Sequence, residues 1–343
     1  MTSLNLESKP DTNAGSRETA PEDAAGGGRV ALIGFGEAGG MLAGGLVSCG
    51  RYRVTVYDIL IGDAERGPAM RRKAGDCGVT LCASAAEAAR GATLVISAVT
   101  AGAAAEVARQ AAGYLQAGQV LLDINSISPE SKRGNAAAVE ACGAAYVEAA
   151  VMAPVHPARM KVPILLGGRQ AQAVADFLAP AGMNLEVVGP VIGEASAIKM
   201  CRSIMIKGLE ALTVECLLTA RHYGVEDRII ASVASSFPGF GFPALSGYFI
   251  ERVVRHGRRR AAEMREAAQT VEQAGIEPLM ADAIARRQDA VADVVARQPA
   301  LQALDEAQWR EALDMIAAAA ADTALSGQEA VVAGCARGKG QFV

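Results

Sequence analysis

The chain has 343 residues, of which 51% are hydrophobic and 20% charged, a globular composition that excludes a disordered or collagen-like chain. A net charge of −4 and an aromatic content of 4% argue against a basic surface or a base-stacking platform for nucleic acid. The seven cysteines are widely spaced without a CxxC pair, so we expect free thiols, no disulfide framework and no metal site.

The ends of the chain and its hydropathy bear on location. Residues 1–28 are polar, rich in Pro, Gly, Ser and Glu, and without a continuous apolar stretch, so we expect a disordered tail and no secretory signal. We find no run of about 18 uncharged apolar residues that predicts a membrane span. We therefore expect a cytoplasmic protein with no membrane partner and, from its length, about two domains.

From residue 29 onward, short apolar runs alternate with helical segments. The runs expected to form buried strands are Val30–Ile33, Arg53–Tyr57, Gly78–Leu81, Thr93–Val99, Val120–Asp123, Ala145–Glu148 and Val162–Leu166. The helices expected among them end near Cys49 or span Ser84–Arg90, Ala103–Leu115 and Pro129–Cys142. This alternation predicts an α/β fold over residues 29–190, with a Rossmann-type parallel sheet covered on both faces.

Beyond about residue 190 the pattern becomes all-helical. The segment Gly193–Tyr223 contains no strong breaker except Gly208 and predicts one long helix of about 30 residues. Further helices are expected at Val225–Ser236, Leu245–His256, Ala261–Ala274, Pro278–Val295 and Ala307–Ala333. We expect residues 191–343 to form an all-α domain that contacts substrate and forms a homodimer, joined to the first domain by the long interdomain helix.

A glycine-rich turn follows the first expected strand and opens a helix. It fits GxGxxG, in which the first glycine permits a tight turn, the second lets the backbone reach a pyrophosphate, and the third lets the helix press on the strand. The residues expected to contact a dinucleotide coenzyme are Gly34, Phe35, Gly36, Glu37, Ala38, Gly39, Asp58, Val99 and Thr100.

Asp58 ends the second strand, 19 residues beyond Gly39. Its carboxylate can accept hydrogen bonds from a ribose diol, whereas a 2′-phosphate there would meet a like charge. No basic residue follows at Ile59, Leu60 or Ile61, so we expect NAD as the cofactor in preference to NADP.

Four stretches together resemble the β-hydroxyacid dehydrogenase superfamily, which includes 3-hydroxyisobutyrate and 6-phosphogluconate dehydrogenases. They are Val30–Gly39, Val56–Asp58, Leu122–Pro129, similar to the family's D-x-S-T-x-S-P, and Gly193–Lys199, similar to its G-x-G-x-x-x-K. The resemblance is closest to the phosphogluconate-dehydrogenase-like subgroup with a divergent C-terminal domain. It implies hydride transfer between a nicotinamide coenzyme and a β-hydroxyacid or related alcohol.

The resemblance also implies roles for individual residues. Lys199 becomes the general base that takes the substrate's hydroxyl proton, with Ser126 in the catalytic site. Ser203 stands where the family has an asparagine one helical turn after the lysine, and it offers no amide donor. The family's late lysine–aspartate pair falls near Ala262-Glu263, so that lysine is absent, although the run Arg258–Arg260 is close.

The segment that cradles the substrate carboxylate in the family also differs. Its Ser-Gly-Gly loop falls on Met152-Ala153-Pro154, and Pro154 has no N–H to donate. His156 and Arg159 lie just downstream and could replace the lost donor, which argues for a substrate unlike the simple small hydroxyacids. The residues expected to contact substrate are Ser126, Met152, Ala153, Pro154, His156 and Arg202.

Other interpretations remain open from the sequence. Lys199, Arg202, Lys207 and Glu210 fall on one helical stripe, which is also the pattern of a solvent-facing surface. Ser126 could serve only to cap the following helix. The whole chain could be an imine or enamine reductase on the same scaffold, or a dinucleotide-sensing protein without catalysis.

Overall fold

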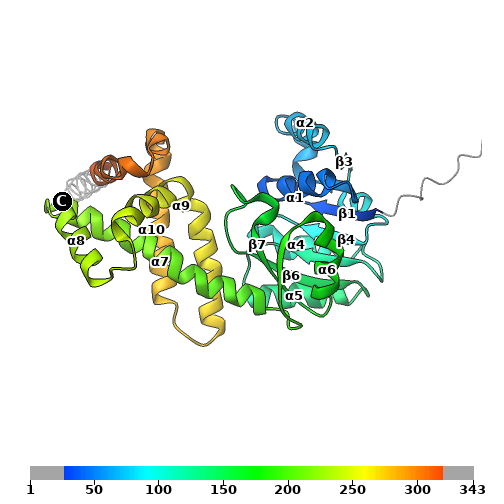
Figure 1. Ribbon diagram of the computed structural model, residues 1–343. Coiled ribbons are helices and arrows are strands. Elements are labelled where there is room, and N and C mark those ends of the chain that lie inside the picture. Colours follow the sequence, from blue (N-terminus) through cyan, green and yellow to red (C-terminus); the bar gives the residue numbers. More distant parts are fainter. Residues whose placement is uncertain (1–26, 320–343) are drawn as a thin grey trace, which may run out of the picture.

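The computed structural model describes residues 27–319, which form an α/β part and a helical part joined by one long helix (Figure 1). The strands are β1 Gly28–Ile33, β2 Tyr52–Tyr57, β3 Thr80–Leu81, β4 Leu94–Ser97, β5 Val120–Asp123, β6 Ala145–Val151, β7 Pro163–Gly167 and β8 Asn184–Gly189. They form one sheet in the order β3-β2-β1-β4-β5-β6-β7-β8. The strand order therefore reverses direction between β1 and β4, where α/β sheets commonly bind ligands.

The sheet is parallel from β3 to β6, as the sequence predicts. The exception lies at the far edge, where β7 pairs antiparallel with β6 and β8 runs parallel to β7. The prediction did not include β8, nor the helices α2 Gly67–Cys77 and α6 Ala171–Leu178. These omissions leave the predicted fold class confirmed.

Both faces of the sheet are covered, because successive strand residues point to opposite sides. In β1, Val30 and Leu32 pack with α1 Glu37–Ser48 and α6, whereas Ala31 and Ile33 pack with the opposite layer. That opposite layer consists of α3 Ala85–Ala89, α4 Ala101–Ala111 and α5 Pro129–Glu140. The result is a doubly wound domain whose loops after β1, β4 and β5 meet at one edge.

The helical part is built around the long helix α7, Glu194–His222. Its other helices are α8 Glu226–Ser236, α9 Phe242–Gln273 and α10 Leu279–Arg297, followed by helical residues at 309–319. Packing of α7, α9 and α10 against one another forms two apolar clusters, one around Val214 and Val253 and the other around Met200 and Met264.

One expected helix boundary is wrong. The sequence predicts separate helices at Leu245–His256 and Ala261–Ala274, whereas α9 runs unbroken through Gly257. An added Cβ at Gly257 would lie 2.8 Å from the carbonyl oxygen of Gln288 on α10. The glycine therefore serves close helix packing there and does not mark a break. The arginine run Arg258–Arg260 that follows it lies inside the helix.

Two predicted features fall wholly or partly outside the described residues. The expected tail at 1–28 overlaps them only at residues 27 and 28, and Gly28 already belongs to β1. Of the expected helix Ala307–Ala333, only the part up to residue 319 is described. Within residues 27–319, no helix is long and apolar enough to cross a membrane.

Candidate active site

The glycine-rich turn after β1 adopts the close packing that its spacing predicts. Gly34 has a φ of +98°, and an added Cβ would lie 2.3 Å from the carbonyl oxygen of Ala98. A Cβ on Gly39 would lie 2.1 Å from the carbonyl oxygen of Gly34. A Cβ on Gly36, by contrast, would meet nothing within 4 Å, and no side chain caps the helix α1 that begins there. Two glycines thus serve the fold, while the third faces open space beside uncapped helix amides.

Asp58 and Lys73 fix this turn from two sides. The Asp58 carboxylate accepts hydrogen bonds from the backbone N–H groups of Phe35 (2.7 Å) and Leu60 (2.9 Å). The Lys73 ammonium on α2 donates to the carbonyls of Phe35 (2.6 Å) and Gly36 (2.7 Å). Sequence reasoning missed Lys73, because it did not identify the helix that carries it.

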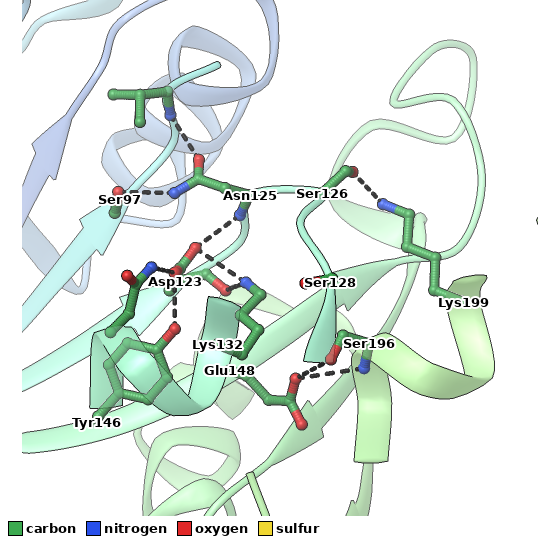
Figure 2. Close-up of polar contacts among 12 residues, drawn as sticks. Ser97, Asp123, Asn125, Ser126, Ser128, Lys132, Tyr146, Glu148, Ser196 and Lys199 are labelled. Atoms are coloured by element: carbon green, nitrogen blue, oxygen red, sulfur yellow. Dashed lines mark hydrogen bonds and ion pairs between the residues drawn. The ribbon is translucent and has the colours of Figure 1, made fainter. Parts of the chain in front are cut away.

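The loops after β4 and β5 are tied together by Asn125. Its side-chain oxygen accepts from the Val99 amide (2.7 Å), and its side-chain nitrogen donates to Ser97 (2.9 Å) (Figure 2). Val99, expected to contact the coenzyme, is thereby held beside the loop that carries Ser126. Asn125 itself was not among the predicted site residues.

A buried ion pair supports the Ser126 loop from below. Lys132 on α5 lies 2.9 Å from the Asp123 carboxylate, and it also donates to the carbonyl of Asp123 (2.7 Å). The Tyr146 hydroxyl donates to the same carboxylate (2.7 Å), as Figure 2 shows. Burial alone would raise the pKa of Asp123, but Lys132 and the Tyr146 hydrogen bond hold it below its ordinary value. This network keeps the carboxylate charged and the loop in one position.

Glu148 on β6 holds the start of α7. This fully buried carboxylate accepts hydrogen bonds from the backbone N–H groups of Gly193 (2.6 Å), Ala195 (3.1 Å) and Ser196 (3.3 Å). It also accepts from the Ser196 hydroxyl (2.8 Å). A negative charge at a helix N-terminus satisfies donors that the helix itself leaves free. Glu148 therefore fixes the helix that carries Lys199.

Lys199 and Ser126 meet directly, as expected for two site residues. The half-buried Lys199 ammonium donates to the Ser126 hydroxyl at 2.5 Å (Figure 2). Burial lowers the pKa of Lys199 to about 8; Glu263 acts in the opposite direction. The cap of α5 is Ser128, whose hydroxyl accepts from the Ser131 amide, so the interpretation of Ser126 as a helix cap is wrong.

Of the four residues on the Lys199 stripe, Lys207 and Glu210 do not face solvent, whereas Arg202 is exposed. Lys207 and Glu210 are buried, with 5% and 0% of their surface exposed. Lys207 donates to the Ser203 hydroxyl (2.9 Å) and forms an ion pair with Glu263 on α9 (3.0 Å). Ser203 is therefore placed between two lysines of the same helix. Lys207 and Glu263 were not among the predicted site residues.

The predicted substrate loop is only partly joined to this group. Arg202 on α7 donates to the carbonyl of Met152 (3.3 Å), which links the loop to the helix of Lys199. Ala153, Pro154 and His156 are exposed. Within residues 27–319, no described contact joins His156 to Lys199 or Ser126.

Helix α9 also contacts the loops of the α/β part. Glu266 on α9 accepts from the Ser128 amide (2.9 Å), and Arg259 on the same helix lies 3.8 Å from Glu37 in the glycine-rich turn. The expected coenzyme turn, the Ser126 loop and the Lys199 helix thus lie at the junction of the two parts.

Two family models match the chain. Residues 29–189 match the NAD binding domain of 6-phosphogluconate dehydrogenase, and residues 220–291 match a domain of unknown function, DUF1932. The first match ends at residue 189 and the second begins at residue 220.

Three similar proteins match between 61% and 84% of this chain. A conserved hypothetical protein from Sinorhizobium meliloti is 38% identical, covers 84% of this chain and 96% of its own, and has a TM-score of 0.71. A conserved protein of unknown function, described as structurally similar to 3-hydroxyacid dehydrogenases, is 34% identical over 77% of this chain and 97% of its own (TM-score 0.64). Mouse mitochondrial 3-hydroxyisobutyrate dehydrogenase is 26% identical over 61% of this chain and 62% of its own length.

Proposed function

Because the chain belongs to the β-hydroxyacid dehydrogenase-like superfamily, with a divergent C-terminal domain, we propose that it is an NAD(P)-dependent dehydrogenase of a β-hydroxyacid or related alcohol. The observation that carries this proposal is the 2.5 Å contact between Lys199 and Ser126 at the edge of a dinucleotide-binding sheet. It joins an amine of suitable basicity to a hydroxyl on the loop after β5.

The glycine-rich turn fits a dinucleotide. The space beside Gly36 and the uncapped N-terminus of α1 offer backbone N–H donors and a helix dipole to a diphosphate. NAD(P)⁺, when bound, supplies the hydride acceptor. The chain's own contribution is to orient the coenzyme through this turn and through the loop that Asn125 holds.

Asp58 supports NAD as the preferred coenzyme. Two backbone donors already contact its carboxylate, and a carboxylate has about four lone-pair sites, so it retains capacity to accept from ribose hydroxyls. A 2′-phosphate at that position would be repelled by the same charge.

Lys199 supplies the proton chemistry. In alcohol oxidation the neutral amine of Lys199 takes the proton of the substrate hydroxyl. The carbon that carries this hydroxyl gives its hydride to the nicotinamide, and a carbonyl forms. With a pKa of about 8, roughly a quarter of the amine is neutral at pH 7.5, compared with about one part in a thousand at the ordinary lysine value. Ser126 holds the amine in place and can share its hydrogen bond with the substrate hydroxyl.

The substrate pocket differs from a simple carboxylate cradle. Pro154 lacks an N–H, while Arg202, on the same helix as Lys199, donates a guanidinium hydrogen bond to the carbonyl of Met152. We propose Met152, Ala153, Pro154, His156 and Arg202 as substrate contacts for an acid bulkier than the simple hydroxyacids.

We further propose that residues 191–343 form a dimerisation domain. Three exposed apolar side chains on α7, Ile198, Met205 and Leu212, recur every seven residues and are 42%, 65% and 57% exposed. A seven-residue spacing returns to nearly the same helix face, so these side chains form a stripe suited to a second copy of the chain.

A substrate panel read by NADH and NADPH absorbance tests the proposed activity. It should contain 2-substituted 3-hydroxyacids, simple hydroxyacids, and amines for the imine-reductase alternative. We expect turnover with a hydroxyacid and its loss in Lys199→Met. Turnover with amines alone would identify an imine reductase, and coenzyme binding without any turnover would identify a sensing protein.

A further inference from the structure

A buried lysine, Lys207, lies two helical turns beyond the half-buried Lys199 on α7. The Lys207 side chain is 7% exposed and its ion-pair partner Glu263 is 27% exposed. Lys207 also donates to Ser203, which lies one turn from each lysine. Burying an ammonium is costly unless it is paired. Lys207 is buried and paired, and the proposed reaction gives it no role.

Glu263 connects this pair to the candidate site. Burial alone would raise its pKa, but Lys207 and Lys199 together hold it below the ordinary value. The carboxylate therefore stays negative and acts on both lysines at once. It stabilises the ammonium of Lys199, while the charge of Lys207 opposes that effect.

We propose that Lys207 is a positioning residue of the candidate site. It holds Ser203 and Glu263 in place and thereby sets the proton affinity of Lys199. This inference rests on the proposed function for its catalytic meaning. Without Lys207, the Glu263 carboxylate would be free to pair with Lys199 and keep it protonated.

The charges around Lys199 come from three helices. Glu263 and Arg259 face it from α9, Lys207 from α7, and Lys132 from α5. Lys132 is already committed to Asp123. Glu263 is thus the one negative group among these four. Its ion pair with Lys207 decides how strongly the Glu263 carboxylate stabilises the Lys199 ammonium.

The size of the effect follows from the helix geometry. Eight residues separate the two lysines, which is about 12 Å along a helix. One unit charge at that distance shifts a pKa by about one unit at the effective dielectric constant typical of proteins. Removing Lys207 should raise the half-titration pH of Lys199 by about that amount, and removing the Glu263 charge should lower it.

The test measures Lys199 directly in the full-length protein. Short pulses of acetic anhydride label neutral amines, and peptide mass spectrometry at a series of pH values reports the half-titration pH of Lys199. We expect about 8 in the wild type, about one unit higher in Lys207→Met, lower in Glu263→Gln, and near 8 in Lys207→Met/Glu263→Gln. Lys207→Arg, which keeps the charge, should restore the wild-type value.

Glu210→Gln is the matched control. It breaks the next buried ion pair between the same helices, to Arg260 (3.0 Å), but removes a negative charge where Lys207→Met removes a positive one. Glu210 lies eleven residues from Lys199, about 16 Å along the helix, so its loss should lower the half-titration pH of Lys199 slightly and not raise it. Equal titration of Lys199 in wild type, Glu263→Gln and Lys207→Met, or a rise in Glu210→Gln equal to that in Lys207→Met, overturns the proposal. If Lys207→Met does not fold by circular dichroism, Glu263→Gln and the double variant decide. The labelling needs no substrate, so an inactive substrate panel would overturn only the proposed function.

Discussion

The attachment of α7 to the sheet gives a quantitative prediction for Glu148→Gln. One Glu148 oxygen accepts from Gly193 and Ala195, and the other accepts from the amide and hydroxyl of Ser196. The substituted amide keeps one accepting oxygen. In the more favourable orientation, the amide oxygen accepts from the N–H groups of Gly193 and Ala195. The amide NH2 group then donates to the Ser196 hydroxyl, which rotates to accept, and the Ser196 N–H is left buried without a partner.

The expected loss combines two contributions. An unpaired buried donor costs about 1–3 kcal/mol, and the missing charge at a helix N-terminus costs about 0.5–2 kcal/mol. We therefore expect the free energy of unfolding to fall by about 1.5–5 kcal/mol, which corresponds to a melting temperature lower by roughly 3–20 °C for a domain of this size. Turnover should fall as well, because Lys199 lies on the loosened helix.

Urea and thermal unfolding followed by circular dichroism measure this loss. Glu130→Gln is the control, since Glu130 also lies in the first turn of a helix but is exposed and forms an ion pair with Arg133 three residues on. Its substitution should cost under about 0.5 kcal/mol. If Glu148→Gln were as stable as this control, our account of how α7 is held would be refuted.

The remaining predictions concern the site and the assembly. With a Lys199 pKa of about 8, the rate of alcohol oxidation should fall about tenfold per pH unit below pH 8, and the rate of the reverse reaction should fall above pH 8. Lys199→Met should lose both pH dependences and about 10²–10⁴ in kcat. A rate that does not change with pH in the wild type would exclude Lys199 as the base. Asp58→Ala should weaken NAD⁺ binding by about 10–100-fold with a smaller effect on NADP⁺, measured by calorimetry, and an unchanged preference would count against the ribose contact. Met205→Glu/Leu212→Glu should convert a dimer to a monomer in light scattering, whereas a monomeric wild type at micromolar concentration would exclude the dimer.

The sequence predicts the α/β part well because its signals are local. A short apolar run predicts each central strand, and the GxGxxG spacing predicts the turn at Gly34. The signals weaken at the sheet edge and in the helical part. Gly257 suggests a helix end locally, yet close packing against Gln288 on α10 makes it the residue that fits there.

The same reasoning explains which site residues the sequence identifies. Lys199 and Ser126 lie within short motifs, so the spacing of residues in those motifs is enough to indicate a site. Lys207 and Glu263 are 56 residues apart in sequence and lie on different helices, so their ion pair depends on how α7 and α9 pack. Helical periodicity places Lys207 on a polar stripe of α7. It does not show that α9 covers this stripe, so the burial of Lys207 could not be predicted.

The central claim is that a dinucleotide binds at the turn around Gly36. Calorimetric titration with NADH and NADPH, on the wild type and on Gly36→Ala, tests it most directly. An added Cβ at Gly36 meets nothing within 4 Å, as at Gly62, so Gly36→Ala and the control Gly62→Ala should melt at the wild-type temperature. We predict that only Gly36→Ala loses coenzyme binding, by tenfold or more. Undetectable uptake of both coenzymes by the wild type, or full binding by Gly36→Ala, would contradict the account.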